Sequence, residues 1–414
     1  MKLSEVLETR GFIHQISTEK LSTIVDGKKR TIYHGIDPTA DSAHAGNMAV
    51  WVLLKHLASD GHKIIFLVGG GTGMIGDPKP DSERELKSQT QVEKNVTKIK
   101  TQAEIFFGDN IIEFVNNYEW LGKLTLIEFL RDIGKHYTVN ELIKKEAIAT
   151  RLASDNGLSY TEFAYPLLQG YDFLELYKTK GCTVQVGGSD QWGNIISGVE
   201  LVRRKEQAEA FAITVPLIVD KGTGKKFGKS EGNAVWLDPA KTSPYQFYQF
   251  WLNVSDESVV DYLKLFTFLS LEEIEVIEKE WSANPGERQA QKSLALAVTT
   301  LVHGEDQAQI SSKISGLLFG DILLEDLSEE EAGVLVDNAP TFNVKIGENI
   351  VDVLVKTELA KSKREAKMFI ENKAISISGS NIINLDTKLN ETYFAQKLAI
   401  LVRGKKQKVV LKLS

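Results

Sequence analysis

The sequence predicts an α/β protein: a domain with a doubly wound, mostly parallel sheet, then a helical domain and a small α+β domain. Short β-rich runs recur in the first 220 residues, and amphipathic helical patterns separate them. After about residue 238 the strand signals fade and helical patterns dominate. Apolar strands that alternate with helices are typical of a parallel, Rossmann-like sheet with helices on both faces.

Four runs are the expected strands of this sheet: "RTIYHGID", "KIIFLVGGG", "CTVQVGGSD" and "AITVPLIVD". Between the first two lies the helical pattern "NMAVWVLLKHLASDG", which begins near Met48. Each run ends in glycine, an acid or both. Ligands bind outside the carboxyl ends of such strands, so we expect Asp37, Asp77, Asp190 and the segment around Lys226 to converge on one crevice.

The remaining chain divides by composition. "SPYQFYQFWLN" and "SLEEIEVIEKEW" are helical patterns, and the acidic run "GDILLEDLSEEEAG" is expected to be an exposed connection. We therefore predict a Rossmann-like domain over 1–235, a helical domain over 236–325, a linker over 326–346 and a small domain over 347–414.

The small C-terminal domain carries a basic helix pattern. In "KSKREAKMFIENK", Lys361, Arg364 and Lys367 are spaced by three, with apolar side chains on the other side, and "AISISGSNI" alternates around a glycine like a hairpin. From Val351 onward 13 Lys and Arg face 6 Asp and Glu, a net charge of +7, which leaves −14 for residues 1–350. A basic tail on an acidic body indicates a polyanionic partner, although a solvated charged face is the alternative.

Composition also suggests where the protein works. The single cysteine, Cys182, excludes an internal disulfide framework and a cysteine-rich zinc site. The N-terminal "MKLSEVLETRGF" lacks the apolar core of a signal peptide, and no apolar run approaches the roughly 18 residues of a membrane span. We expect a cytoplasmic protein without a membrane partner.

Two glycine-rich segments resemble nucleotide motifs without matching them. "KGTGKKFGKSEG" follows a strand, but the P-loop glycine five residues before Gly228 is replaced by Thr223. Gly71, Gly73 and Gly76 spell a G-x-G-x-x-G, yet Asp77-Pro78 follows at once, where a dinucleotide fingerprint requires a helix. A P-loop phosphotransferase remains an alternative. "GGSDQ" lacks the second glycine of a nucleophile elbow, and no dense His/Cys/acid cluster predicts a structural metal.

Two further stretches place polar side chains in apolar surroundings. In "SYTEFAYPLLQGYDFLELY" a capping-box pattern predicts a helix start, and Tyr165, Gln169 and Asp172 fall on one face. This stripe faces either water or a pocket whose ligand pairs with it. In "DPTADSAHAGN", His44 and Asn47 lie at a helix N-terminus, where N–H donors suit phosphate.

In this order, "YHGIDPTADSAHAGN", "TEFAYPLLQGYDF", "QVGGSDQWGN" and "KFGKS" closely resemble the motifs of bacterial tyrosyl-tRNA synthetases, which are class I enzymes. The resemblance covers nearly the whole chain, including a tail similar to S4-type RNA-binding domains. "HAGN" corresponds to the HIGH signature, with Asn47 in place of the second histidine, and "KFGKS" corresponds to the KMSKS signature.

The resemblance implies a two-step reaction. Tyrosine and Mg²⁺-ATP give tyrosyl-adenylate and pyrophosphate, and the tyrosyl group then passes to the terminal adenosine of tRNA(Tyr). Because a carboxylate is already nucleophilic, the first step needs positive charge and N–H donors for the departing pyrophosphate. The residues implied for this are His44, Asn47, Lys226, Lys229, Lys79 and Arg84.

The resemblance also implies the binding residues. Those implied for tyrosine are Tyr33, Asp77, Tyr165, Gln169, Asp172 and Gln185. Those implied for ATP and the adenylate are Gly35, Asp37, Thr39, Gly188, Asp190, Gln191 and Lys229. Those implied for tRNA are Arg203, Arg204, Lys361, Arg364 and Lys367.

By the same resemblance the chain is expected to form a homodimer. The tryptophan-specific relatives are the nearest rivals, and Asp172 with Tyr33 and the S4-like tail favour tyrosine. A non-catalytic RNA-binding protein that keeps the same fold is a further alternative, which would bind tRNA without activating an amino acid.

Overall fold

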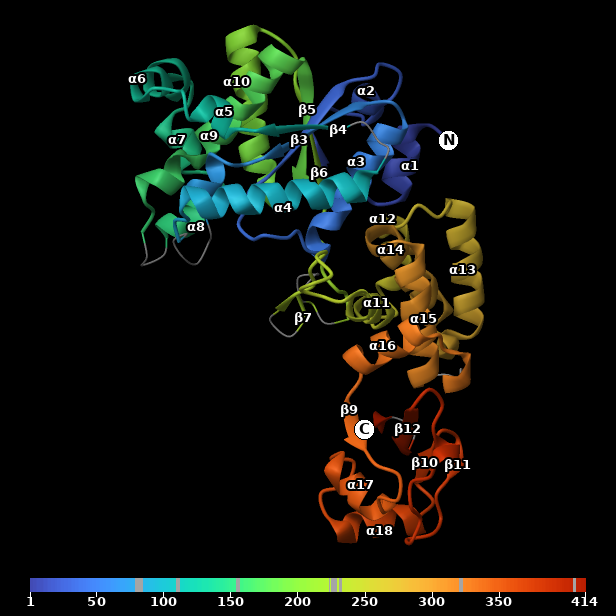
Figure 1. The fold of residues 1–414 in the computed structure, drawn as a ribbon. Coiled ribbons are helices and arrows are strands. Elements are labelled where there is room, and N and C mark those ends of the chain that lie inside the picture. The colour runs from blue at the N-terminus through green and yellow to red at the C-terminus, as the bar shows by residue number, and fades with distance from the viewer. Residues whose placement is uncertain are drawn as a thin grey trace. The chain divides into compact units, whose positions relative to one another are not determined.

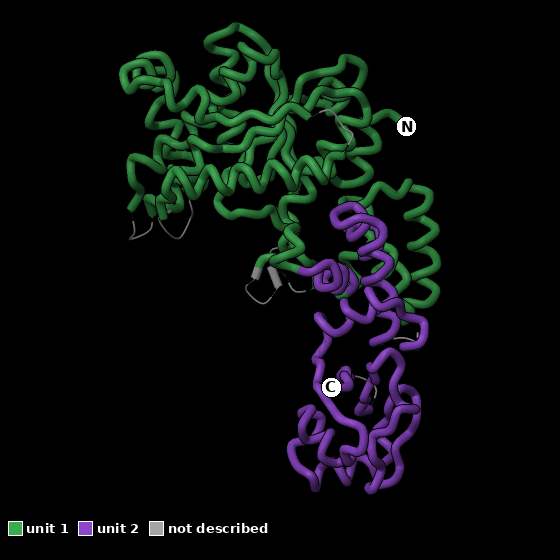
Figure 2. Tube along the Cα trace, viewed as in Figure 1, with its two compact units in different colours: residues 1–242, 253–294 green, residues 243–252, 295–414 purple. Residues whose placement is uncertain are grey.

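The computed structural model forms two compact units, which are described separately (Figure 2). Unit 1 comprises 1–242 and 253–294, and unit 2 comprises 243–252 and 295–414. The structure describes residues 1–78, 85–108, 112–153, 157–222, 224, 229–230, 233–319, 323–404 and 407–414; at 229, 230 and 233 it describes the backbone alone. No helix within these ranges has the length and apolar character needed to cross a membrane.

Unit 1 is built on a twisted sheet whose six described strands run in the order β1-β6-β5-β2-β3-β4. All neighbouring pairs are parallel except β1 with β6 at one edge. The strands are β1 (Gln15–Ile16), β2 (Thr31–Ile36), β3 (Lys63–Val68), β4 (Ile112–Asn116), β5 (Cys182–Gly188) and β6 (Phe211–Val215). The four strands predicted from the sequence are β2, β3, β5 and β6, so the parallel α/β prediction is confirmed.

Helices cover both faces of this sheet, because successive side chains of a strand point to opposite sides. On one face Ile65 and Leu67 pack in a core with Phe173 and Leu201 of helices α9 (Tyr160–Lys180) and α10 (Trp192–Glu206). On the other face Phe66 packs against Trp51 of α3 and Phe107 of α4, with ring centroids 5.4 and 6.0 Å apart. Helices α3 (Met48–Ser59) and α4 (Gln89–Phe107) follow β2 and β3, respectively (Figure 1).

Shorter helices complete unit 1. They are α1 (Leu3–Thr9), α2 (Ser22–Val25), α5 (Tyr118–Leu121), α6 (Leu126–Glu128), α7 (Val139–Leu142), α8 (Glu146–Leu152), α12 (Val259–Phe266) and α13 (Leu271–Ala283). Arg10, which is almost fully buried, donates hydrogen bonds to the carbonyls of Lys264 and Thr267, both at 2.9 Å. This cation satisfies the open carbonyls at the end of α12 and joins that helix to the N-terminal segment.

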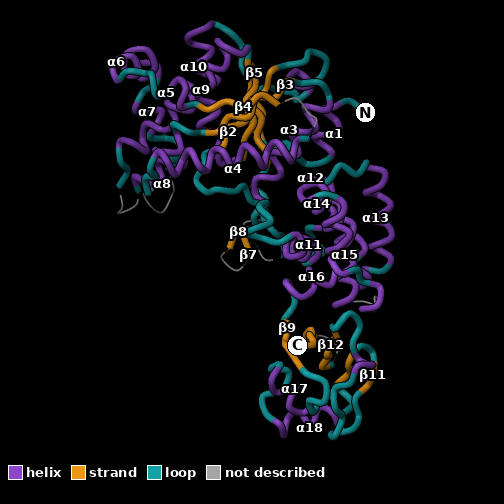
Figure 3. The backbone as a smooth tube through the Cα atoms, viewed as in Figure 1, coloured by secondary structure: helices purple, strands orange, loops and turns teal. Residues whose placement is uncertain are grey.

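Unit 2 combines helices with a five-stranded sheet (Figure 3). Its elements are α11 (Pro244–Leu252), α15 (Glu305–Phe319), α16 (Glu329–Asn338), α17 (Ile350–Lys356), α18 (Lys363–Glu371), β9 (Thr341–Val344), β10 (Ile375–Ile377), β11 (Ser380–Asn381), β12 (Leu398–Arg403) and β13 (Gln407–Leu413). Helix α14 (Gln289–His303) spans the boundary between the two units. Ile314 and Leu335 share one core with Leu398 and Val410 of the sheet.

The structure corrects two local expectations. The end of the acidic run expected to be an exposed connection instead begins helix α16, whose Ser328 and Glu331 make a capping box and whose Leu335 is buried. Lys361 precedes α18 rather than lying on it, because Ser362 caps that helix. The predicted hairpin is confirmed as β10 and β11.

Candidate active site

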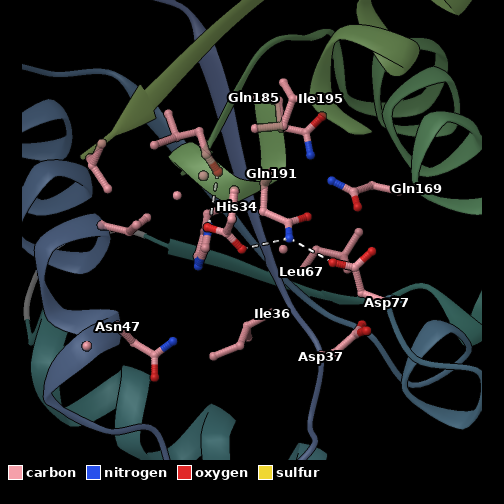
Figure 4. A pocket seen from close by; sticks show the side chains of 18 of the residues that line it. His34, Ile36, Asp37, Asn47, Leu67, Asp77, Gln169, Gln185, Gln191 and Ile195 are labelled. Carbon is pink, nitrogen blue, oxygen red and sulfur yellow. Dashed lines mark hydrogen bonds between the residues drawn. The ribbon is translucent and has the colours of Figure 1, made fainter. Parts of the chain in front are cut away.

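A cavity of about 410 Å³ opens at the carboxyl ends of β2, β3, β5 and β6. Side chains from α9, the start of α3 and the loop after β3 also line it (Figure 4). In that view Asn47 lies on one side of the cavity, and Gln169 and Asp77 lie on the other. We call the side formed by Asp172, Asp77 and Asp37 the carboxylate side, and the side formed by His44 and Asn47 the donor side.

Asp172 is the most buried carboxylate of the cavity, with 3% of its surface exposed. It accepts one hydrogen bond from Asn117 Nδ2 at 2.9 Å and one from Trp120 Nε1 at 2.7 Å. Burial raises the pKa of Asp172 to about 7, and these two donors oppose that rise. Within the described residues, the carboxyl is therefore oriented by neutral groups, and no cation contacts it.

Tyr33 contributes a second polar atom to the same region. Its ring, on β2, is fully buried and packs edge-on against Phe173 with centroids 5.2 Å apart. Its hydroxyl has no hydrogen-bond partner among the described residues, and the same is true of Gln185 Oε1. Burial, followed by the charge of Asp172, raises the pKa of Tyr33 well above its usual value, so the hydroxyl keeps its proton. Unpaired buried polar atoms in a cavity indicate that a ligand supplies the partners.

Asp77 lies in the loop after β3, on the carboxylate side. Its two oxygens accept hydrogen bonds from Gln191 Nε2 at 2.9 Å and Asn194 Nδ2 at 3.0 Å. Burial raises the pKa of Asp77 to about 6, and the nearby Asp37 contributes to the rise. A half-buried carboxylate of this kind is a favourable partner for a ligand's ammonium group.

Asp37 completes this side and is held by two hydroxyl groups. Tyr165 donates to one oxygen at 2.8 Å and Thr72 donates to the other at 2.7 Å. A Cβ at Gly69 would collide with both Asp37 and Thr72, so glycine is required where the β3 backbone passes close to this pair. Gly69, directly after β3, therefore allows close packing around this acid.

The donor side is organised by the turn that leads into α3. His44 Nδ1 accepts a hydrogen bond from the Gly46 amide at 3.1 Å, so a neutral imidazole carries its proton on Nε2. Asn47 Oδ1 accepts from the His44 amide at 3.1 Å, which leaves the Nδ2 group to donate to a ligand. The turn thus presents N–H groups at the N-terminus of a helix, where anions are favoured.

His34 is the remaining histidine of the cavity lining. Its Nδ1 lies 3.1 Å from the carbonyl oxygen of Val186, and its ring packs edge-on against Phe66. Burial lowers the pKa of His34 to about 4. The ring is therefore neutral at physiological pH, with the proton on Nδ1 and an acceptor at Nε2.

The structure brings most of the predicted site residues together. All predicted tyrosine residues line the cavity, as do His44 and Asn47 of the predicted catalytic set. Of the predicted ATP set, Gly35, Asp37, Thr39, Gly188, Asp190 and Gln191 also line it. Lys79, Arg84 and Lys226 lie outside the described residues, and of Lys229 only the backbone is described, in β7 (Lys229–Ser230), which pairs with β8 (Asn233–Ala234).

The residues predicted to bind tRNA are not among those that line the cavity. Arg203 and Arg204 are near the end of α10, where both pair with Glu200 of the same helix. Arg364 and Lys367 line a separate hollow on α18 of unit 2. Their roles, like those of the cavity residues, remain predictions.

Sequence reasoning missed the groups that hold the carboxylates: Asn117, Trp120, Thr72 and Asn194. Asn117 follows β4, a strand that was not predicted, and donates to both Asp172 and Thr72. Neither Asn117 nor Trp120 belongs to a motif, so only the position of Asn117 at the end of a strand could have drawn attention to it. Within the described residues, no group of three or more His, Cys, Asp or Glu side chains could hold a metal ion.

Comparison with known proteins agrees with this geometry. The family described as "tRNA synthetases class I (W and Y)" matches residues 26–320. The family described as "Tyrosine--tRNA ligase SYY-like C-terminal domain" matches residues 331–411. The fold and the cavity thus define a class I aminoacyl-tRNA synthetase.

Individual relatives narrow this class. Tyrosine–tRNA ligase 2 of Enterococcus faecalis is 48% identical over 99% of this chain and 98% of its own length. Tyrosine–tRNA ligase of Streptococcus mutans is 47% identical over 99% and 100%. A C-terminally truncated mitochondrial tyrosyl-tRNA synthetase of Aspergillus nidulans superimposes with a TM-score of 0.68 at 32% identity, covering 75% of this chain and 92% of that one. The chain belongs to the tyrosine–tRNA ligase family, which confirms the predicted resemblance.

Proposed function

We propose that this chain activates L-tyrosine with ATP, transfers it to tRNA(Tyr), and uses the two sides of the cavity for different parts of that work. The observation that carries the assignment is the buried pair of Asp172 and Tyr33. A buried carboxylate and an unpaired buried hydroxyl that line the same cavity are complementary to a phenol, which both donates and accepts a hydrogen bond.

In the bound state the substrate phenol donates to Asp172 and accepts from Tyr33. Its ammonium group is held by Asp77, with Tyr165 and Gln169 beside it. Phenylalanine would leave the buried Asp172 and Tyr33 without their ligand partner, and a site of this kind rejects such an analogue strongly, as this enzyme family itself illustrates. Gln185, whose Oε1 is unpaired, is the further residue assigned to tyrosine.

Activation joins a carboxylate oxygen of tyrosine to the α-phosphorus of ATP. The bond to the bridging oxygen breaks, and pyrophosphate leaves with the electron pair. Negative charge builds on the phosphates, and donors that meet this charge lower the barrier more than donors that only hold the ground state. We assign His44 Nε2–H and Asn47 Nδ2 to this role, together with the family's lysine segment at Lys226 and Lys229 and the loop residues Lys79 and Arg84.

ATP is assigned to the part of the cavity beside the strand ends of β2 and β5. Its binding residues are Gly35, Asp37, Thr39, Gly188, Asp190 and Gln191, with Lys229 from the lysine segment. Mg²⁺ enters as the ATP complex, since triphosphate oxygens are the hard ligands this ion prefers.

Transfer follows when a ribose hydroxyl of the terminal adenosine of tRNA attacks the tyrosyl carbonyl carbon and AMP leaves. We assign Arg203 and Arg204 to the acceptor end of the tRNA, and Lys361, Arg364 and Lys367 to its backbone elsewhere. Lysine and arginine contacts to phosphate make affinity fall steeply with salt.

The tRNA assignment is tested by reversing charge on α18. Deleting the chain after about Gly347 would strip Leu398 and Val410 from a core that they share with α15 and α16, so charge reversal is the cleaner change. The double variant Arg364→Glu, Lys367→Glu should keep pyrophosphate exchange and lose most tRNA charging. Equal tRNA charging by the double variant and the unsubstituted protein would refute the assignment.

We assign the protein to the cytoplasm and to a homodimer. The dimer is supported by exposed apolar side chains in the stretch of chain from α6 to α7: Leu126 (69% exposed), Ile127 (68%), Leu130 (45%) and Val139 (62%). A second copy of the chain would cover them. Analytical ultracentrifugation of the unsubstituted protein should give twice the mass of one chain, and the Ile127→Asp variant should give the mass of one chain. An unsubstituted protein with the mass of one chain would contradict the assignment.

The activity itself is tested by exchange of labelled pyrophosphate into ATP with the purified protein and Mg²⁺. Exchange should depend on tyrosine and should not be supported by phenylalanine. No exchange would favour the non-catalytic RNA-binding alternative.

A further inference from the structure

The segment that follows the lysine loop is hydrogen-bonded to the segment that carries His44. The Ala45 amide donates to the carbonyl of Val235 at 2.8 Å, and the Leu237 amide donates to that of Ala43 at 2.9 Å. Between these bonds His44 and Trp236 form an antiparallel bridge. The end of the lysine segment and the catalytic histidine are therefore parts of one backbone pair.

Side chains extend this pairing. The Trp236 ring packs edge-on against the His44 imidazole, with centroids 6.1 Å apart and an interplanar angle of 67°. The Lys241 ammonium lies 5.0 Å from the centroid of the Trp236 ring, a cation–π contact. A ring held by a cation on its face has fewer orientations available, and the imidazole that packs against it is restricted in turn.

Lys241 is itself anchored. Its Nζ lies 2.5 Å from Asp41, a residue three positions before His44, and Asp41 also accepts from Lys98 of α4 at 2.8 Å. Hydrogen bonds from Lys241 and then Lys98 lower the pKa of Asp41 to about 2, so this carboxylate stays ionised at any working pH. Lys241, Asp41 and Trp236 are not among the residues that line the cavity, and the contact that joins them to it in the described structure is the one with His44 and its backbone.

We propose that Lys241 is a positioning residue for tyrosine activation: by joining Asp41 to the face of Trp236, it holds the His44 imidazole and the end of the lysine segment in register with each other. The inference rests on the proposed role of His44. Donors that meet transition-state charge must be held within a fraction of an ångström, so a loosened His44 slows activation without weakening tyrosine binding.

The competing interpretation is an ordinary surface ion pair. Such pairs contribute little to stability, and their loss leaves kinetic constants unchanged. Lys98 supplies a matched control, because it pairs with the same carboxylate and is similarly exposed, 42% against 32% for Lys241, without contacting Trp236 in the described structure.

The experiment compares Lys241→Met with Lys98→Met in tyrosine-dependent pyrophosphate exchange by the full-length protein. Lys241→Met should lower kcat about tenfold with KM for tyrosine within about twofold of the unsubstituted value, because only transition-state contacts are loosened. Lys98→Met should leave both constants unchanged, and Lys241→Arg, which keeps the cation over the ring, should restore kcat. Equal kinetics for Lys241→Met and Lys98→Met would overturn the inference.

A second variant guards against a folding defect at position 241. Trp236→Leu should lower kcat by a similar factor, and the double variant with Lys241→Met should lose no more than either single change, because both break one linkage. If the kcat of the double variant fell by the product of the two single losses, the inference would be overturned while the proposed function would stand. Absence of exchange by the unsubstituted protein would instead overturn the proposed function, and this inference with it.

Discussion

The carboxylate side and the donor side of the cavity are built on opposite plans. On the carboxylate side, Asp172 is buried and Asp77 is half-buried. Both accept hydrogen bonds from neutral amide or indole groups, and their pKa values are raised to about 7 and about 6. On the donor side, His44 and Asn47 lie at the N-terminus of a helix. Asn47 Oδ1 accepts a hydrogen bond from the His44 amide, and His44 Nδ1 accepts one from the Gly46 amide. On the carboxylate side, partly desolvated carboxylates become more stable when a bound substrate pairs with them. On the donor side, N–H groups stabilise the negative charge that develops on the phosphates during the reaction.

Removing the central carboxylate should have the largest effect. In Asp172→Ala, the donors Asn117 Nδ2 and Trp120 Nε1 lose their acceptor, and the substrate phenol loses its own. We expect kcat/KM for tyrosine in pyrophosphate exchange to fall roughly 10³-fold or more. Glu175→Gln, on the same helix but outside the cavity lining, is the control and should behave as the unsubstituted protein. Normal rejection of phenylalanine by Asp172→Ala would contradict the placement of the phenol.

Removing a donor on the other side of the cavity should change kcat rather than KM for tyrosine. His44→Ala is expected to lower kcat by about 10²-fold to 10³-fold while KM for tyrosine changes little, since its N–H meets charge only in the transition state. His14→Ala, an exposed histidine, serves as the control. If KM for tyrosine rose as much as kcat fell, the two sides would not divide binding and catalysis.

Acid should weaken the carboxylate side before the donor side. Because the pKa of Asp77 is about 6 in the ligand-free protein, it is ionised above that pH and protonated below it. Tyrosine binding needs ionised Asp77 to pair with the ammonium group and ionised Asp172, whose pKa is about 7, to accept from the phenol. Affinity should therefore be level above about pH 8, begin to fall as the pH passes 7, and fall more steeply below pH 6, where both carboxylates are protonated. Calorimetric titration across pH 5 to 9 measures this. Asp77→Asn should bind weakly at every pH and lose the additional steepness below pH 6, and an unchanged profile would assign that steepness to another group.

A smaller effect is expected from the groups that hold Asp172. Trp120→Phe removes one N–H donor to the carboxylate while keeping an aromatic ring, so KM for tyrosine should rise about tenfold, the effect of one charged hydrogen bond. Tyr118→Phe changes an exposed neighbour that does not contact Asp172 in the described structure and should have no effect. An unchanged KM for tyrosine in Trp120→Phe would mean that Asn117 alone orients the carboxylate.

Much of this architecture could be predicted from the sequence. Strands β2, β3, β5 and β6 are β-rich runs that end in or are followed by glycine or an acid. Both the parallel sheet and the convergence of Asp37, Asp77 and Asp190 could therefore be predicted from these runs and the helices between them. The stripe on α9 was found by its helical spacing. Whether it faced water or a pocket was left open by that spacing, and the structure places all three of its residues on the cavity.

The supporting groups could not be predicted in the same way. Strand β4 is at the sheet edge and is only half-buried along its length, so its sequence lacks the apolar run that identifies the other strands. The role of Asn117, which directly follows this strand, is evident only from its hydrogen bond to Asp172 in the folded structure. The link between Lys241 and His44 likewise joins residues almost 200 positions apart, and no local pattern reports such a contact.

Equilibrium dialysis of labelled tyrosine, without ATP, tests the division of labour between the two sides most directly. The account predicts that His44→Ala binds tyrosine as tightly as the unsubstituted protein, while Asp172→Ala shows no measurable binding at the same concentrations. Loss of binding in His44→Ala, or retained binding in Asp172→Ala, would contradict it.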